Sequence, residues 1–169
     1  MHDIQNGTYA TLQELCNLSI YEDSFDSDNV KKILEKVGYY DIRKRMKDYH
    51  EVGDHIFVHG WIPCYNYGYI HIYNHNWRNS THSEWKEARW LNGMDMWRFG
   101  IKEPNKTIYC GHWNCSYGWS KIRQKRKEFP NKNKKDFLKS FEPFIDDGIC
   151  AIDSCVAYSG HINVVTLEL

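Results

Sequence analysis

Residues 56–63 have the sequence Ile-Phe-Val-His-Gly-Trp-Ile-Pro, and they are the starting point for predicting the fold of the chain. The first three residues form a short apolar run, which is typical of a buried strand. This run ends abruptly at the His-Gly pair of residues 59–60. Residues 107–112 read Thr-Ile-Tyr-Cys-Gly-His and repeat the pattern, because a short apolar run again stops at a glycine and a histidine. The sequence therefore predicts two buried strands that end in the same chemical way.

Both strand ends suit a binding site. Strand ends in α/β folds present loops at the rim of the sheet, where ligands collect. Glycine lets the backbone turn sharply, so that the neighbouring imidazole can point into a site, and neutral imidazole is the commonest metal ligand in proteins. A single histidine at a strand end is more often structural, but two matching ends favour a shared site. The residues alone leave both interpretations of His59 and His112 open, as structural histidines or as ligands of a common metal ion.

Hydrophobic periodicity predicts the other elements. The Asp-Ser-Asp sequence of residues 26–28 offers N-cap chemistry for a helix that ends at Gly38. Leu12, Leu15 and Leu18 also have helical spacing. We further expect helices over 42–49 and 83–90, mostly loop over 64–81, and a terminal hairpin formed by 149–152 and 162–167 with its turn at 158–160. No internal repeat or linker composition interrupts the chain, so one compact unit is the simplest account.

Composition indicates an ordinary globular domain. The 169 residues are 41% hydrophobic and 15% aromatic, which separates the chain from disordered sequences. Lys and Arg balance Asp and Glu at 22 each, so the net charge does not indicate a nucleic-acid partner. No apolar run approaches the ~20 residues that span a bilayer, and no signal-peptide pattern is present. We therefore expect a cytoplasmic protein with no membrane partner, whose six cysteines are reduced thiols.

One segment departs from this balance. Residues 121–135 carry eight Lys or Arg side chains against a single Glu. Such a run is usually a solvated surface loop. The alternative is a surface that faces phosphate or nucleic acid, and beside a phosphatase site it would attract phosphorylated substrates electrostatically.

The strand ends also resemble a known family. Residues 56–63 are similar to the "strand, His-Gly-x-x-Pro" element of calcineurin-like metallophosphoesterases, in particular the bacterial serine/threonine protein phosphatase-like branch. Residues 110–114 resemble the later Gly-His-x-His element of that family, residues 6–12 its Asn-Gly stretch, and residues 149–167 its final strands. The order fits along the whole chain. The resemblance implies that residues 1–169 are a single domain, the C-terminal portion of such a phosphoesterase, with an α/β fold in the form of a partial sandwich of two β-sheets flanked by helices.

The resemblance also implies the chemistry. It makes His59 and His112 ligands of a binuclear site for Mn, Fe or Zn, and Arg89 a residue that grips the substrate phosphate with its guanidinium fork. The structural alternative for Arg89 is stacking on Trp85 or Trp90. Asn114 stands where the family has its second histidine, so it is a weaker candidate ligand. The implied activity is phosphoester hydrolysis, on a phosphorylated protein or small molecule.

The chain departs from the family in its earlier motifs. The Asp-x-His, Gly-Asp-x-x-Asp and Gly-Asn-His elements are absent, and residues 53–55 (Gly-Asp-His) resemble them in composition only and precede the wrong strand. A two-metal phosphatase needs a carboxylate that both ions share, and no residue of this chain is assigned a catalytic role. We therefore expect this polypeptide by itself to hydrolyse phosphoesters poorly.

Two other functions fit the sequence. Cys110, His112 and Cys115 are clustered before the basic segment, as in a zinc-containing nucleic-acid-binding module, although structural zinc sites need a second, closely spaced ligand pair. A tightly held zinc ion would identify the module. A non-catalytic protein could instead use its many tryptophans and tyrosines to stack on sugars or bases. Loss of both histidines would leave ligand binding intact in such a protein.

Overall fold

The computed structural model describes residue 14, residues 27–123 and residues 138–167. The predicted features at residues 6–18 and most of the basic segment lie outside the described residues. The chain divides into two compact units, residues 1–47 and residues 48–169. The single phosphoesterase domain over 1–169 stays a prediction.

Residues 27–47 of the first unit contain two short helices. Helix α3 (Ser27–Lys36) begins at the predicted cap, and Gly38 follows it with a positive φ of 72°. A positive φ strains any residue with a Cβ, so a glycine is expected where this helix ends. Helix α4 (Tyr39–Arg45) begins and ends earlier than the predicted 42–49. The prediction was wrong at its end because Tyr49 belongs to a strand of the second unit.

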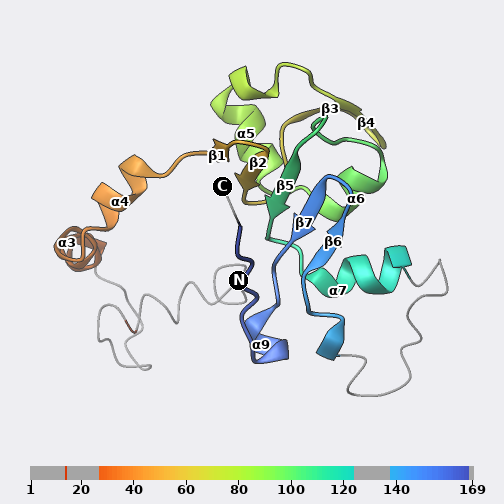
Figure 1. Ribbon diagram of the computed structural model, residues 1–169. Helices are drawn as coiled ribbons and strands as arrows, with labels where there is room; N and C mark the ends of the chain where they lie inside the picture. The colour runs from red at the N-terminus through yellow and green to blue at the C-terminus, as the bar shows by residue number, and fades with distance from the viewer. Residues whose placement is uncertain (1–13, 15–26, 124–137, 168–169) are drawn as a thin grey trace. The chain divides into compact units, whose positions relative to one another are not determined.

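The second unit is built on a five-stranded mixed sheet with the order β1-β2-β5-β7-β6 (Figure 1). Its strands are β1 (Tyr49–Val52), β2 (His55–Val58), β5 (Thr107–Cys110), β6 (Phe144–Asp146) and β7 (Ile149–Ala151). The three central strands β2, β5 and β7 are parallel, whereas the edge strands β1 and β6 pair antiparallel with their neighbours. Both strands predicted from the short apolar runs are confirmed as neighbours at the centre of this sheet.

One row of isoleucines crosses the parallel strands. Ile56 pairs with Ile108, which pairs in turn with Ile149, and all three side chains are fully buried. Each contributes roughly 1.5–3 kcal/mol by leaving water. Because side chains alternate along a strand, this row fixes which residues face the core and fixes the register of the three strands.

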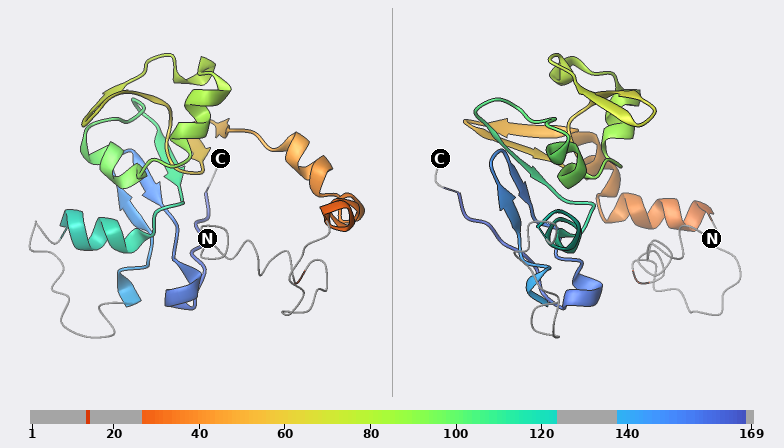
Figure 2. Two further views of the ribbon diagram at one scale, coloured as in Figure 1. Left: turned by 180° about the vertical axis from the view of Figure 1, so that it is seen from behind. Right: turned by 90° about the vertical axis from the view of Figure 1, so that its right-hand side faces the viewer.

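The prediction of loop over 64–81 was wrong. Strands β3 (Cys64–Tyr67) and β4 (Ile70–Tyr73) form a separate antiparallel hairpin, and a 3-10 turn η1 (Trp77–Asn79) follows it (Figure 2). The two-residue loop between the strands begins at Gly68, whose φ is 69°. Glycine at this position is typical of a tight hairpin turn. Most apolar residues of the hairpin are exposed, so the segment lacks the usual pattern of apolar residues that face the core.

Two helices connect β2 to β5. Helix α5 (His82–Ala88) carries a capping box, in which Thr81 and Glu84 satisfy each other's backbone N–H groups. It confirms the helix predicted over 83–90. Helix α6 (Gly93–Arg98) is capped by the Asn92 side chain and was not predicted. Helical crossovers of this kind let two neighbouring strands run parallel.

The chain end differs from the predicted hairpin. Strand β7 pairs with β6, which precedes it, through a turn at Asp147 and Gly148. Residues 156–159, where the turn was expected, form the short helix α9 (Val156–Ser159), and residues 162–167 form no strand. The prediction was wrong because β7 already has β5 on one side and β6 on the other, which leaves no free edge for a later strand.

The observed architecture is mixed α/β, with one five-stranded mixed sheet, a two-stranded ribbon and helices. The predicted fold class is confirmed at this level. Within the described part of the chain, no helix combines the length and the apolar character that crossing a bilayer requires.

Candidate functional site

Three polar side chains follow the three parallel strands. His59 comes directly after β2, His112 two residues after β5, and Asp153 two residues after β7. Because the strands are parallel and adjacent, their carboxyl ends lie at one edge of the sheet. The two histidines were predicted from sequence. Asp153 was not, although it carries the same signal, a polar side chain that follows a short apolar run.

Backbone hydrogen bonds hold the three strand ends together. The N–H of Gly111 donates to the carbonyl of His59 (2.8 Å), and the N–H of Ile152 donates to the carbonyl of Cys110 (2.9 Å). The N–H of Cys115 donates to the carbonyl of Asp153 (2.8 Å). The loops that carry the candidate residues are therefore continuations of the sheet ladder and are positioned by it.

The two imidazoles lie against each other. The ring centroids of His59 and His112 are 5.0 Å apart, with an angle of 46° between the ring planes. Burial lowers the pKa of His112, the neighbouring His59 lowers it further, and the carboxylate of Asp153 acts in the opposite direction. His112 therefore favours the neutral form, which is the form that binds metals.

His112 occupies an unusual backbone conformation. Its φ is 64°, and the N–H of Trp113 donates to the carbonyl of Gly111 (2.7 Å), which closes a three-residue turn around it. A residue other than glycine seldom adopts such a turn, which costs about 1–3 kcal/mol. Strained turns of this kind concentrate at functional sites, and the residue in this one has its ring 5.0 Å from that of His59.

The glycine beside each histidine has a different local role. A Cβ on Gly60 would lie 2.5 Å from the carbonyl oxygen of Arg89 and 2.7 Å from that of Ala88, so no side chain fits there. A Cβ on Gly111 would meet only the His59 carbonyl, at an ordinary 3.7 Å. The His-Gly pair after β2 is therefore required for close packing against the end of α5, whereas the Gly-His pair after β5 leaves room.

Arg89 is engaged in an ion pair. One terminal nitrogen of its guanidinium group, Nη2, donates to a carboxylate oxygen of Asp48. The side chain is 42% exposed, and its backbone carbonyl packs against Gly60, next to His59. The contact that the structure assigns to Arg89 is thus with Asp48, and neither Trp85 nor Trp90 has a described cation–π contact with it. Its role at a phosphate stays a prediction.

Asn114 caps the short helix α7 (Cys115–Tyr117), which continues into the π-helix η2 (Gly118–Arg123; Figure 1). Its side-chain oxygen accepts a hydrogen bond from the hydroxyl of Ser116. The structure therefore gives this amide a local partner on its own helix. Its role as a metal ligand stays a prediction.

Two exposed tryptophans border the imidazole pair. The ring of Trp90 meets that of His112 edge to face, with centroids 5.0 Å apart, and the ring of Trp113 lies 6.4 Å from it. The indole N–H of Trp113 also donates to the carbonyl of Trp90 (3.4 Å). Two indole rings therefore lie beside the His112 ring.

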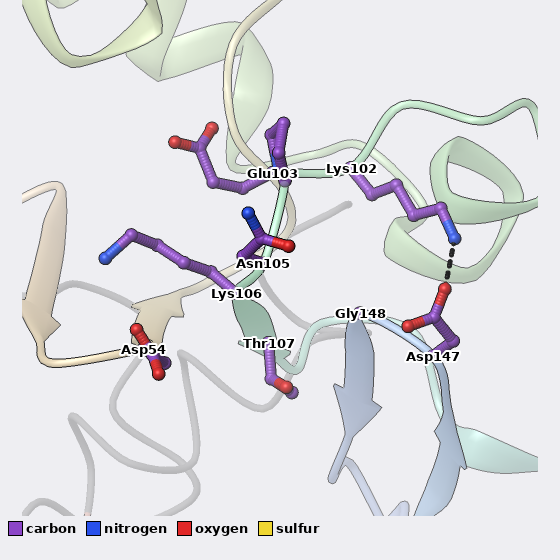
Figure 3. A pocket seen from close by; sticks show the side chains of 9 residues that line it. Asp54, Lys102, Glu103, Asn105, Lys106, Thr107, Asp147 and Gly148 are labelled. Carbon is purple, nitrogen blue, oxygen red and sulfur yellow. Dashed lines mark hydrogen bonds and ion pairs between the residues drawn. The ribbon is translucent and has the colours of Figure 1, made fainter.

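Charged residues gather at the opposite edge of the sheet, where the parallel strands begin. An open pocket of about 570 Å³ lies there, between Asp54, Thr107 and Gly148. Figure 3 shows Lys102 reaching Asp147 across its rim, and their hydrogen bond is 2.6 Å long. The pocket is lined by residues that were not predicted as functional. Lys102 and Asp147 pair with each other, whereas Lys106 pairs with Glu51 and Glu103 pairs with Arg78, both outside the lining.

Neither a protein-family model, nor a curated protein, nor a solved structure matches the chain. Among the described residues, no group of three or more His, Cys, Asp and Glu side chains is arranged to hold a metal ion. The site is therefore defined by its own geometry, which is a pair of contacting imidazoles with a carboxylate in electrostatic reach.

Proposed function

We propose that residues 48–169 contribute a divalent-metal site to a metal-dependent phosphoesterase, with His59 and His112 as ligands. The observation that carries this proposal is the contact between two imidazoles that extend from adjacent parallel strands. The resemblance of residues 56–63 and 110–114 to metallophosphoesterase motifs supports the choice of reaction.

The imidazole pair has dimensions that fit one shared ion. Metal–nitrogen bonds of about 2.0–2.1 Å at a tetrahedral angle place two ring centres about 5 Å apart, and the observed separation is 5.0 Å. The lowered pKa of His112 supports the neutral form that coordination needs. Imidazole suits Mn, Fe and Zn alike, so the proposal extends to the class of divalent metals.

The neighbouring charges have roles in this proposal. A bound metal would supply an activated water and hold phosphate oxygens. The Asp153 carboxylate opposes the net lowering of the His112 pKa, and it would likewise favour a cation between the rings. Arg89 would bind a phosphate oxygen with the N–H groups that Asp48 does not use, since a guanidinium has five N–H donors.

The alternative of a zinc module is less well supported by the thiols. Burial raises the pKa of Cys115 to about 12 and raises that of Cys110 further above the ordinary range. Both thiols are buried, and that of Cys115 already donates to the backbone carbonyl of Ala151 (3.1 Å). This chemistry favours the imidazoles over Cys110 and Cys115 as ligands.

Metal titration of the full chain tests the proposal. We expect saturable Mn²⁺ binding, measured by electron paramagnetic resonance of free Mn²⁺, that His59→Ala or His112→Ala weakens by about 10-fold or more. His82→Ala is the matched control, because His82 is exposed at the start of α5. Equal affinity in all three variants would contradict the proposal.

Two further readouts separate binding from turnover. Metal affinity should hold at pH 7 and fall as the pH drops below the ordinary histidine pKa of about 6.5, because protonated imidazole does not coordinate. We expect hydrolysis of p-nitrophenyl phosphate by the isolated chain to be weak. Strong turnover would contradict that expectation and leave the assignment of the ligands standing.

A further inference from the structure

The distribution of tryptophan in the second unit is uneven. All seven tryptophans lie between residues 61 and 119. Three are buried (Trp61, Trp77 and Trp85) and two are partly buried (Trp97 and Trp119). The remaining two, Trp90 and Trp113, are 61% and 40% exposed. Both exposed indoles are the ones whose rings contact His112.

The placement of these two rings is supported by fixed contacts. Trp113 packs edge to face on Tyr117 (5.6 Å between centroids), and the Tyr117 hydroxyl donates to Asp95 on α6 (2.6 Å). The backbone of Trp90 is fixed at the end of α5, where its N–H donates to the carbonyl of Glu87 (3.0 Å). A single exposed aromatic ring is ordinary, whereas neighbouring exposed rings form a contiguous apolar patch, which is the feature that marks binding sites.

We propose that Trp90 and Trp113 form a stacking wall that selects phosphoesters carrying a planar aromatic ring. This inference rests on the proposed function of the imidazole pair, which would hold the phosphate. An indole face stacks on any flat π system, including a nucleobase and a phenol ring. The shared chemistry is therefore a phosphate joined, directly or through a sugar, to a planar ring that reaches the indoles when the phosphate is at His59 and His112.

Small phosphate probes separate the contribution of the ring from that of the phosphate. The probes are adenosine monophosphate, phenyl phosphate, ribose 5-phosphate and adenosine, each titrated by calorimetry into the full chain with Mn²⁺. We expect the two probes that carry both groups to bind more tightly than ribose 5-phosphate. The comparison of adenosine monophosphate with phenyl phosphate shows whether a nucleotide or an aryl phosphate such as a tyrosyl phosphate is the better source of the ring.

Single substitutions then test whether Trp90 and Trp113 bind the planar ring of the probe. Trp90→Ala and Trp113→Ala should each weaken adenosine monophosphate by roughly 5- to 100-fold and leave ribose 5-phosphate unchanged. Trp113→Phe should retain most of the affinity. Tyr69→Ala is the matched control, because Tyr69 is 99% exposed on the β3–β4 turn.

Each pattern of results decides one of the two proposals. Equal affinity for adenosine monophosphate in Trp90→Ala, Trp113→Ala and Tyr69→Ala overturns the stacking wall. An equal loss for adenosine monophosphate and ribose 5-phosphate also overturns it, since the indoles would then act through His112. If the tryptophan variants lose the ring-bearing probes while His59→Ala leaves every phosphate affinity unchanged, the wall stands and the proposed metal site fails.

Discussion

The two edges of the parallel strands differ in how their polar groups are used. At the edge where the strands begin, Lys102 pairs with Asp147 (2.6 Å), and Lys106 pairs with Glu51 (3.1 Å). At the edge where they end, two imidazoles contact each other and a strained turn holds one of them. At the first edge, charged side chains pair with one another, and these ion pairs stabilise the fold. At the second edge no such pairing of the imidazoles with a carboxylate is described, and this difference is the reason we propose it as the functional edge.

The charges of the first edge belong to a larger network. Arg78 donates two hydrogen bonds to Glu51 (2.8 and 2.7 Å) and pairs with Glu103 (2.9 Å), and its guanidinium lies 4.2 Å from the centre of the Trp77 ring. The indole N–H of Trp77 also donates to Glu103 (2.8 Å). The network therefore joins β1, η1 and the segment before β5, and its residues are predicted to affect stability more than binding.

The largest expected effect lies at the edge proposed to be functional and tests how tightly that edge is packed. Gly60→Ala places a Cβ against two backbone carbonyls, neither of which can move aside easily. We expect it to lower the free energy of unfolding by about 3 kcal/mol or more. Urea denaturation followed by tryptophan fluorescence measures this, because every tryptophan lies in the second unit.

The matched variant for this prediction is Gly111→Ala, on the neighbouring strand end. Its added methyl group meets only one atom at 3.7 Å, so we expect a change below about 1 kcal/mol. Similar losses in the two variants would show that the packing difference between the two strand ends is not real.

The next effect tests the paired edge. Arg78→Met removes the cation that two carboxylates share. Lys106 still pairs with Glu51, and Glu103 keeps its hydrogen bonds from Tyr73 and Trp77. We expect a loss of about 2 kcal/mol, below the range for fully buried pairs because the Arg78 side chain is 33% exposed. The same urea titration measures it. An unchanged stability would mean that this network does not hold the fold.

A pH titration tests how this network stabilises the fold. The hydrogen bonds from Arg78 lower the pKa of Glu51 to about 2, against the opposing effect of burial. A carboxyl with a lowered pKa stabilises the fold above its unfolded value of about 4.5, and this contribution is lost as the pH falls towards 2. Glu51→Gln should therefore cost about 1–2 kcal/mol at pH 7. The difference from the unmodified chain should shrink below pH 4.5, and a difference independent of pH would contradict the assigned cause.

The smallest effect concerns the pair that Figure 3 shows. The Asp147 side chain is 87% exposed, so water and salt screen its attraction to Lys102. We expect Lys102→Met to change the unfolding free energy by less than about 1 kcal/mol. A loss of unfolding free energy as large as that of Arg78→Met would show that this exposed pair stabilises the fold as much as the less exposed Arg78 network does.

Local sequence signals predicted part of the secondary structure. The apolar runs at 56–58 and 107–110 became β2 and β5; three of the four residues of β5 are buried, whereas in β2 only Ile56 is buried and the others are partly buried. The hairpin β3–β4 was missed, because its outward residues Tyr65, Tyr67, Ile70 and Ile72 are exposed apolar side chains that mask the usual alternation. Strand β6 was also missed, although the Asp147-Gly148 pair after it is a hairpin signal.

The sequence by itself determined that two histidines end two buried strands, because strand burial and glycine turns depend on near neighbours in the chain. Only the tertiary structure decided that these strands are adjacent and parallel, that Asp153 follows the next strand, and that Trp90 reaches His112. Such pairings join residues far apart in the chain, and their free energy depends on the burial and register of the whole sheet. A local pattern does not contain that information.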